Sequence, residues 1–214
     1  MKKQTRMWLI VTYAIIFLLV VIRNLLLPVQ GTSFIWFCDL APLFLLIFTF
    51  IDNEQLNKAV VSIGFFPQLF VLLVIVLFIF RQDFADKLSS VVSSWDIAST
   101  LVTAPMFSMI VEIILHIFPV NLALIFTYKE KPTRKSLVYA GILLLLIYAS
   151  TIVFTQRSAN INLIYSSGLN VPYYSLLWPL LMFVFVVLPT HALQYGLWKF
   201  SRRNKQSSKQ PRHQ

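Results

Sequence analysis

The side chains best suited to chemistry in this 214-residue chain are Glu112 and His116, which lie within a long apolar segment. Their positions differ by four, and on an α-helix this spacing places both side chains on one face, within reach of each other. A carboxylate beside an imidazole can hold or relay one proton. The same pair can instead serve only packing, as a hydrogen-bonded contact between helices. Both interpretations stay open at this point.

Cys38 and Asp39 form a second candidate group, in the stretch Trp36-Phe37-Cys38-Asp39. A thiol becomes a nucleophile when a base removes its proton, and Cys38 with His116 as base would give the arrangement of acyl-transferring thiol enzymes. Cys38, His116 and Glu112 are therefore the candidate catalytic residues. A lone cysteine in an apolar helix is also commonly a small hydrophobic residue, so the structural alternative stays open.

Five further polar residues are candidate substrate-binding groups: Asp39, Arg23, Arg157, Asn160 and Asn162. The two arginines are cations that could pair with the carboxylates of Asp39 or Glu112, and the two asparagines could supply hydrogen bonds. Each also has an ordinary structural explanation. An arginine near a helix end commonly extends to the lipid headgroups, and an asparagine between helices commonly makes a turn.

Several classes of site are excluded or disfavoured by residue counts. Cys38 is the single cysteine, which excludes an intramolecular disulfide and a metal site built from several thiolates. No set of three or four ligands has metal-binding spacing, so we expect no metal site and no cofactor. The net charge of +10 would suggest nucleic acid in a soluble protein, but the basic residues gather in a few connecting segments and tails, so no nucleic-acid partner is expected.

The elements that must position these residues are membrane helices. The chain is 58% hydrophobic and 12% charged, against about 45–50% and 25% in soluble domains. About 20 apolar residues are needed to cross a bilayer. Six segments are predicted to do so: Met7–Leu27, Phe34–Ile51, Ala59–Phe80, Thr103–Tyr128, Leu137–Phe154 and Tyr173–Trp198. Asp96–Val102, before the fourth, is predicted to be interfacial or re-entrant.

The distribution of positive charge predicts the orientation. Fourteen of the 18 lysines and arginines, including Lys58, fall on one side of the predicted spans. Because cytoplasmic segments carry the excess of positive charge, we expect both termini in the cytoplasm and the protein in the plasma membrane. Residues 1–200 are predicted to form a single six-span domain, and residues 201–214 a basic, disordered cytoplasmic tail.

Four stretches carry a resemblance: Trp36-Phe37-Cys38-Asp39, His116-Ile117-Phe118-Pro119, Asn160-Ile161-Asn162 and Pro189-Thr190-His191. Together they resemble a family of prokaryotic six-helix membrane proteins of uncharacterised activity. The resemblance implies an all-α fold over most of the chain and no particular reaction. More remotely, a cysteine in an early span and a histidine in a later one are similar to membrane lipid acyltransferases. That similarity implies Cys38 and His116 as the reacting pair.

Three functional hypotheses follow, in this order. The first is an intramembrane lipid-binding protein, or an enzyme that transfers or hydrolyses a lipid acyl group, with an outer-half polar cavity that Cys38, Asp39, Glu112 and His116 line. The second is a small proton-coupled transporter that uses Glu112 and His116 as a relay, since charged pairs within a membrane mark ion and proton paths. The third is a membrane assembly or scaffold protein. The expected partner is the lipid bilayer, with a lipid as candidate substrate or ligand.

Overall fold

The computed structural model describes residues 3–26, 37–80, 106–155, 164 and 173–207. This part of the chain is all-α, with no strand among the described residues. Its elements, in chain order, are α1 (Lys3–Leu26), α2 (Phe37–Phe50), α3 (Glu54–Phe80), α6 (Met106–Ile117), α7 (Pro119–Thr127), α8 (Arg134–Phe154), α9 (Tyr174–Met182), the π-helical turn η4 (Phe183–Val187) and α10 (Leu188–Ser207).

The expectation of a multi-pass, all-α membrane protein is confirmed at this level. Five helical stretches of the described residues are long and apolar enough to cross a membrane: Lys3–Leu26, Glu54–Leu73, Ile110–Thr127, Arg134–Phe154 and Tyr174–Arg203. The second predicted span, Phe34–Ile51, contains α2, which has 14 residues. At 1.5 Å per residue α2 is about 21 Å long, against about 30 Å for a hydrocarbon core. The predicted Asp96–Val102 segment lies outside the described residues.

A tight turn joins α2 to α3 and fixes where both helices end. Asp52 adopts a positive φ of 58°, which aspartate tolerates better than most residues. The side-chain oxygen of Asn53 then accepts hydrogen bonds from the backbone N–H groups of Gln55 and Leu56, at 3.2 Å each. These bonds satisfy two of the free donors in the first turn of α3. The two helices therefore form an antiparallel hairpin.

Prolines interrupt the fourth and sixth segments. Pro119 begins α7 directly after Phe118, and proline suits a first helical turn because it has no N–H to be satisfied there. In the sixth segment, the π-helical turn Phe183–Val187 precedes Pro189. The ring of Pro189 cannot sit against the carbonyl group four residues earlier, and a locally wider turn accommodates it. The regular hydrogen bonding along the helix is therefore interrupted at Pro119 in the fourth segment and at Pro189 in the sixth.

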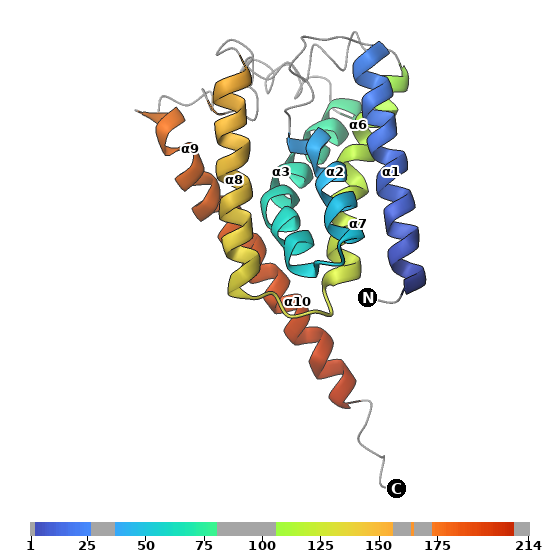
Figure 1. Ribbon diagram of the computed structural model, residues 1–214, viewed down its shortest axis with the longest axis vertical. Coiled ribbons are helices and arrows are strands. Elements are labelled where there is room, and N and C mark those ends of the chain that lie inside the picture. Colours follow the sequence, from blue (N-terminus) through green and yellow to red (C-terminus); the bar gives the residue numbers. More distant parts are fainter. Residues whose placement is uncertain (1–2, 27–36, 81–105, 156–163, 165–172, 208–214) are drawn as a thin grey trace, which may run out of the picture.

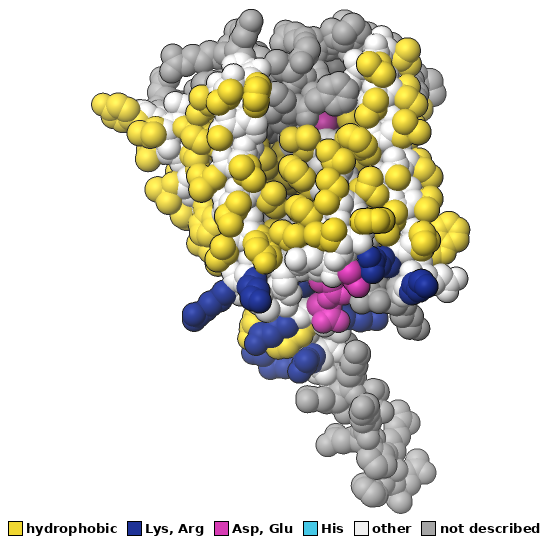
Figure 2. Space-filling view, in the orientation of Figure 1, with side chains coloured by type: hydrophobic (Ala, Val, Ile, Leu, Met, Phe, Trp, Pro, Cys, Tyr) yellow, Lys and Arg dark blue, Asp and Glu magenta, His cyan; other side chains and the backbone are white. Residues whose placement is uncertain are grey.

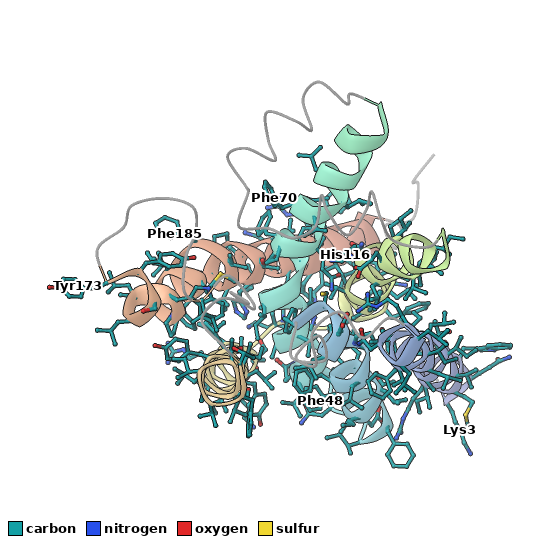
Figure 3. The ribbon with its side chains drawn as sticks, turned by 90° about the horizontal axis from the view of Figure 1, so that it is seen from above. Lys3, Phe48, Phe70, His116, Tyr173 and Phe185 are labelled. Atoms are coloured by element: carbon teal, nitrogen blue, oxygen red, sulfur yellow. The ribbon has the colours of Figure 1, made fainter. Side chains whose placement is uncertain are left out.

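Helix α3 occupies the middle of the bundle. It packs against α2, α6, α7, α8, η4 and α10, while α1 packs against α2 and α6 on one side, as Figure 1 and the view from above in Figure 3 show. The main core is formed by buried apolar residues that include Leu45 of α2, Val60 of α3 and Leu144 of α8. The outer surface is also apolar over the middle of the molecule, and lysines and arginines gather at one end (Figure 2). We call this end, where the α2–α3 turn and the α7–α8 connection lie, the basic end.

The last helix is longer than expected. The prediction placed a disordered tail from Ser201 onward, whereas α10 continues to Ser207. The tail residues 201–207 therefore extend the helix, which the apolar pattern could not indicate because these residues are polar and basic. Residues 208–214 lie outside the described part of the chain.

Gly64 provides a test of the packing around α3. A Cβ atom at this position would lie 2.7 Å from the Phe37 ring and 3.0 Å from Val120, whereas one at Gly196 of α10 would meet nothing within 4 Å. We expect Gly64→Leu to lower the free energy of unfolding by about 1–3 kcal/mol, because overpacking displaces α2 and α7. Gly196→Leu is the control and should leave stability unchanged or raised. Thermal unfolding of both variants in one detergent measures the difference, and equal stability would contradict this packing.

Candidate functional site

Arg23, in the last turn of α1, is buried inside the bundle, with 6% of its surface exposed. Its Nη2 lies 2.6 Å from Oδ2 of Asp39, in the first turn of α2. Its Nη1 forms a second ion pair with Oε1 of Glu112 in α6. One guanidinium therefore joins three helices. A planar, forked donor is suited to this arrangement, because two of its nitrogens can bind two separate carboxylates at once.

Asn24 completes the hydrogen bonding around Asp39. Its side-chain nitrogen donates to Oδ2 of Asp39 at 3.2 Å, and its side-chain oxygen accepts from Arg23 at 3.1 Å. Asp39 is 1% exposed. A carboxylate this deeply buried requires both a counter-ion and hydrogen-bond donors, and neighbouring residues of α1 supply both.

His116 lies one helical turn after Glu112 and contacts it twice. Its Nδ1 is 2.8 Å from the backbone oxygen of Glu112 and 3.5 Å from Oε2 of the same residue. A carbonyl oxygen can only accept, so Nδ1 carries the hydrogen in this contact. In the neutral ring, Nε2 is then the nitrogen that is free to accept a proton. We call Arg23, Asn24, Asp39, Glu112 and His116 the charged cluster.

The two carboxylates of the cluster differ in exposure. The side chain of Glu112 is 26% exposed, against 1% for Asp39 and 6% for His116. Glu112 is therefore the member through which the cluster reaches its surroundings. Asp39 is enclosed behind the guanidinium. In the view from above, the labelled His116 lies beside the helices that carry the other members (Figure 3).

Cys38 lies next to the cluster without joining its histidine. Its Sγ is 3.8 Å from Oδ1 of Asp39, the residue that follows it. Among the described residues, Cys38 and His116 share no hydrogen bond, and the imidazole contacts Glu112 instead. The geometry thus places the thiol beside a carboxylate. The proposed catalytic pairing of Cys38 with His116 stays a prediction.

The remaining predicted residues divide into two groups. Arg23 forms ion pairs with Asp39 and Glu112, the two carboxylates predicted as its candidate partners. Arg157, Asn160 and Asn162 lie outside the described residues. Within the described ranges, no group of three or more His, Cys, Asp and Glu residues could hold a metal ion.

Sequence reasoning missed a second polar group, which we call the Lys58 cluster: Lys58, Ser62, Thr127, His191 and Gln194. Lys58 is 0% exposed and its Nζ donates to the backbone oxygen of Thr127 at 2.6 Å, at the end of α7. The side-chain nitrogen of Gln194 donates to the backbone oxygen of Lys58 at 3.2 Å and to the Ser62 hydroxyl at 2.8 Å. The spacing of Lys58 and Ser62, one helical turn apart, was the available signal.

Replacing Arg23 should expose the dependence of the fold on the charged cluster. We expect Arg23→Gln to lower the free energy of unfolding by about 3–5 kcal/mol, because it leaves the buried carboxylate of Asp39 and the partly buried one of Glu112 without a counter-ion. Arg6→Gln is the matched control on the same helix. Arg6 pairs with Asp52 where both side chains are substantially exposed, 32% and 46%, so its loss should cost about 1 kcal/mol or less. Thermal unfolding in detergent compares the two, and similar losses would contradict a special role for Arg23.

Comparisons with known proteins identify no relative. The chain matches no family model, no curated protein and no solved structure. The function is therefore argued from the charged cluster and from the helices that hold it.

Proposed function

We propose that this protein is a small proton-coupled membrane carrier and that the charged cluster is its proton-binding site. The observation that carries the proposal is that one arginine faces two carboxylates within an apolar bundle. With both carboxylates ionised, Arg23, Asp39 and Glu112 have a net charge of −1. An uncompensated charge is costly in a low-dielectric interior, and one proton on a carboxylate or on His116 removes it. The cluster is therefore suited to hold one exchangeable proton.

The geometry also favours a route for that proton. Glu112 is the partly exposed member, and the Nε2 atom of His116 is the free acceptor in the neutral ring. A proton taken up at Nε2 makes the ring cationic, and the Nδ1 proton can then pass to Oε2 of Glu112, 3.5 Å away, which returns the ring to neutral while Asp39 keeps Arg23 in place. Two acceptors joined in this way act as one coupled site, in which the proton belongs to the pair.

Transport requires helices that can adopt two arrangements, and interrupted helices support this part of the proposal. The α6–α7 segment has a break at Phe118 and Pro119, two residues after His116. The sixth segment contains the π-helical turn η4. Discontinuous spans near buried charges are a recurrent feature of secondary transporters. Protonation would weaken the bond between Glu112 and Arg23, and α6 could then move relative to α1.

We further propose the orientation and the number of spans. The lysines and arginines gathered at the basic end favour a cytoplasmic location for that end and for both termini (Figure 2). The hairpin of α2 and α3 favours counting α2 as a short sixth crossing in the plasma membrane. On this proposal, residues 1–200 form a single membrane domain, and the end of α10 at Ser207 extends it by seven residues.

The lipid-acting enzyme remains an alternative proposal, along with its resemblance to membrane acyltransferases. In that reaction the Cys38 thiolate would attack the carbonyl carbon of a lipid ester, form a thioester and release the lipid alcohol, which takes the proton held by His116. Its support is the closeness of Cys38 to the cluster. The hydrogen bond of His116 to Glu112, and the contact of the thiol with Asp39, favour the proton-binding function instead. A purely structural role in assembly is the third proposal.

The carrier proposal is tested by Glu112→Gln. Purified protein in vesicles with an internal pH-sensitive dye would be given small solutes one at a time, under an inward proton gradient. We expect at least one solute to accelerate internal acidification in the unmodified protein. Glu112→Gln should abolish this acceleration, because the amide cannot take up a proton. Glu130→Gln removes an exposed carboxylate in the connection between α7 and α8; it is the control and should retain the acceleration.

Infrared difference spectroscopy adds a measurement that needs no solute. A change of pH should produce the band of a protonated carboxyl group in the unmodified protein and in Glu130→Gln, and the band should weaken in Glu112→Gln. Solute-driven acidification that survives in Glu112→Gln would exclude Glu112 as the coupling residue.

The alternative enzyme hypothesis makes its own prediction at Cys38. A thiol nucleophile requires that Cys38→Ala abolish any lipid-acyl transfer or hydrolysis, and that the unmodified protein form an acyl adduct detectable by intact mass after incubation with phospholipid. On the carrier proposal we expect no adduct, and we expect Cys38→Ala to keep the solute-driven acidification. An adduct that disappears in Cys38→Ala would favour the enzyme.

A further inference from the structure

Several side chains in the described interior have buried polar atoms without a hydrogen-bond partner, and most of these lie on α3 and α10. On α3 they are Oδ1 of Asn57 and both side-chain atoms of Gln68, and on α10 they are Nδ1 of His191 and Oε1 of Gln194. Gln68 is 3% exposed and Gln194 is 0% exposed. A buried polar atom normally has a partner, and where the protein supplies none, an internal water does so.

The polar residues of α3 lie on two adjacent faces of the helix, because Ser62 and Gln68 are about 120° apart around its axis. Lys58 and Ser62 are one turn apart, and Gln68 lies within about 80° of Lys58 around the helix axis, ten residues or about 15 Å further along. Gln194 links α10 to this side through its hydrogen bonds with Lys58 and Ser62. His191 precedes Gln194 by three residues, on the same face of α10, and lies within electrostatic range of Lys58. The face of α3 that carries Lys58 and Ser62 therefore lies against α10 near the basic end.

Gln68, on the adjacent face of α3, lies toward the charged cluster. Gly64 meets Phe37 of α2 and Val120 of α7, which fixes the level of these helices beside α3. Gln68 follows Gly64 by one turn on the same face, and His116 precedes Val120 by one turn in the antiparallel neighbour (Figure 1). Counted along the two helices, Gln68 and His116 each lie one turn beyond the level where Gly64 meets Val120. Both are buried in the described structure.

We propose that α3 lines a file of internal water that runs from the charged cluster, past Gln68 and Ser62, to the Lys58 cluster at the basic end. The ligands of this site are water molecules, held by the partnerless atoms of Gln68, Gln194 and His191. The file is the route by which a proton held at the charged cluster exchanges with the basic end. The proton route rests on the proposed carrier function, whereas the presence of water does not.

The first test measures water access with Ag⁺, a bare cation small enough to enter narrow hydrated paths and reactive with thiols. In a Cys38→Ser background, Gln68→Cys and Gln194→Cys introduce single thiols into the proposed file. Leu69→Cys and Leu193→Cys introduce them at the neighbouring positions, whose side chains are 49% and 37% exposed on the apolar surface. In lipid vesicles, we expect Ag⁺ to block the file thiols about tenfold faster than the control thiols. After the Ag⁺ reaction the protein is unfolded and treated with a maleimide, which labels the thiols that Ag⁺ has not blocked. The loss of maleimide labelling with time of Ag⁺ exposure gives the reaction rate.

The second test uses stability and requires no probe. If the Gln68 amide were dry and unbonded, Gln68→Leu would remove a penalty and raise the unfolding midpoint by about 2–4 °C or more. If the amide binds internal water, the same substitution gives no increase, because it removes satisfied hydrogen bonds. We expect no increase. Leu69→Gln serves as the control for an amide placed against lipid and should lower the midpoint.

The outcomes separate this proposal from the carrier function. Equal Ag⁺ reaction rates at Gln68→Cys and Leu69→Cys, or a rise in the unfolding midpoint of Gln68→Leu, would overturn the water file whatever the vesicles transport. Fast reaction at Gln68→Cys and Gln194→Cys, without any solute-driven acidification, would establish the file and reject the carrier. Should Gln68→Cys fail to fold, the Gln194→Cys and Leu193→Cys pair decides the question.

Discussion

A guanidinium surrounded by apolar helices has to find its anions inside the protein, since neither lipid nor the hydrophobic core can supply them. Arg23 finds two, Asp39 and Glu112, and they come from two other helices. The last turn of α1, the first turn of α2 and the middle of α6 are therefore held at one depth and in one rotation, because any sliding would separate a buried charge from its partner. The position of His116 and the contact of Cys38 with Asp39 both follow from this arrangement.

Sequence reasoning succeeded where the determining interaction is local. The contact between Glu112 and His116 follows from a spacing of one helical turn, and the fifth predicted span, Leu137–Phe154, ends where α8 ends, at Phe154, because its apolar run stops there. The ion pair between Arg23 and Asp39 could be predicted as one of a few possible pairings, because few cations lie within the predicted spans. The roles assigned to Cys38 and to the substrate-binding candidates stay predictions.

Sequence reasoning failed where packing between distant segments decides the environment. Lys58 counted as one more cation near a membrane surface, yet it is fully buried because α7 and α10 close over it. The partner of its backbone, Gln194, is 136 residues away, and an amide in an apolar helix gives no sign of what it will meet. The predicted span Phe34–Ile51 contains α2, and because residues 34–36 lie outside the described part of the chain, the start of this span stays a prediction.

The order of the ion pairs along the chain bears on how the protein is inserted into the membrane. Asp39 follows Arg23 by 16 residues, whereas Glu112 follows it by 89. Each charge presented alone to the lipid costs about 2.5–3.5 kcal/mol, so α1 and α2 benefit from leaving the translocon together as a neutral hairpin. At about 5–20 residues per second, Glu112 is synthesised roughly 4–15 s after Asp39. For those seconds Arg23 and Asp39 form a neutral ion pair in the nascent chain. Glu112, which adds the second negative charge, arrives with α6 after that pair has formed.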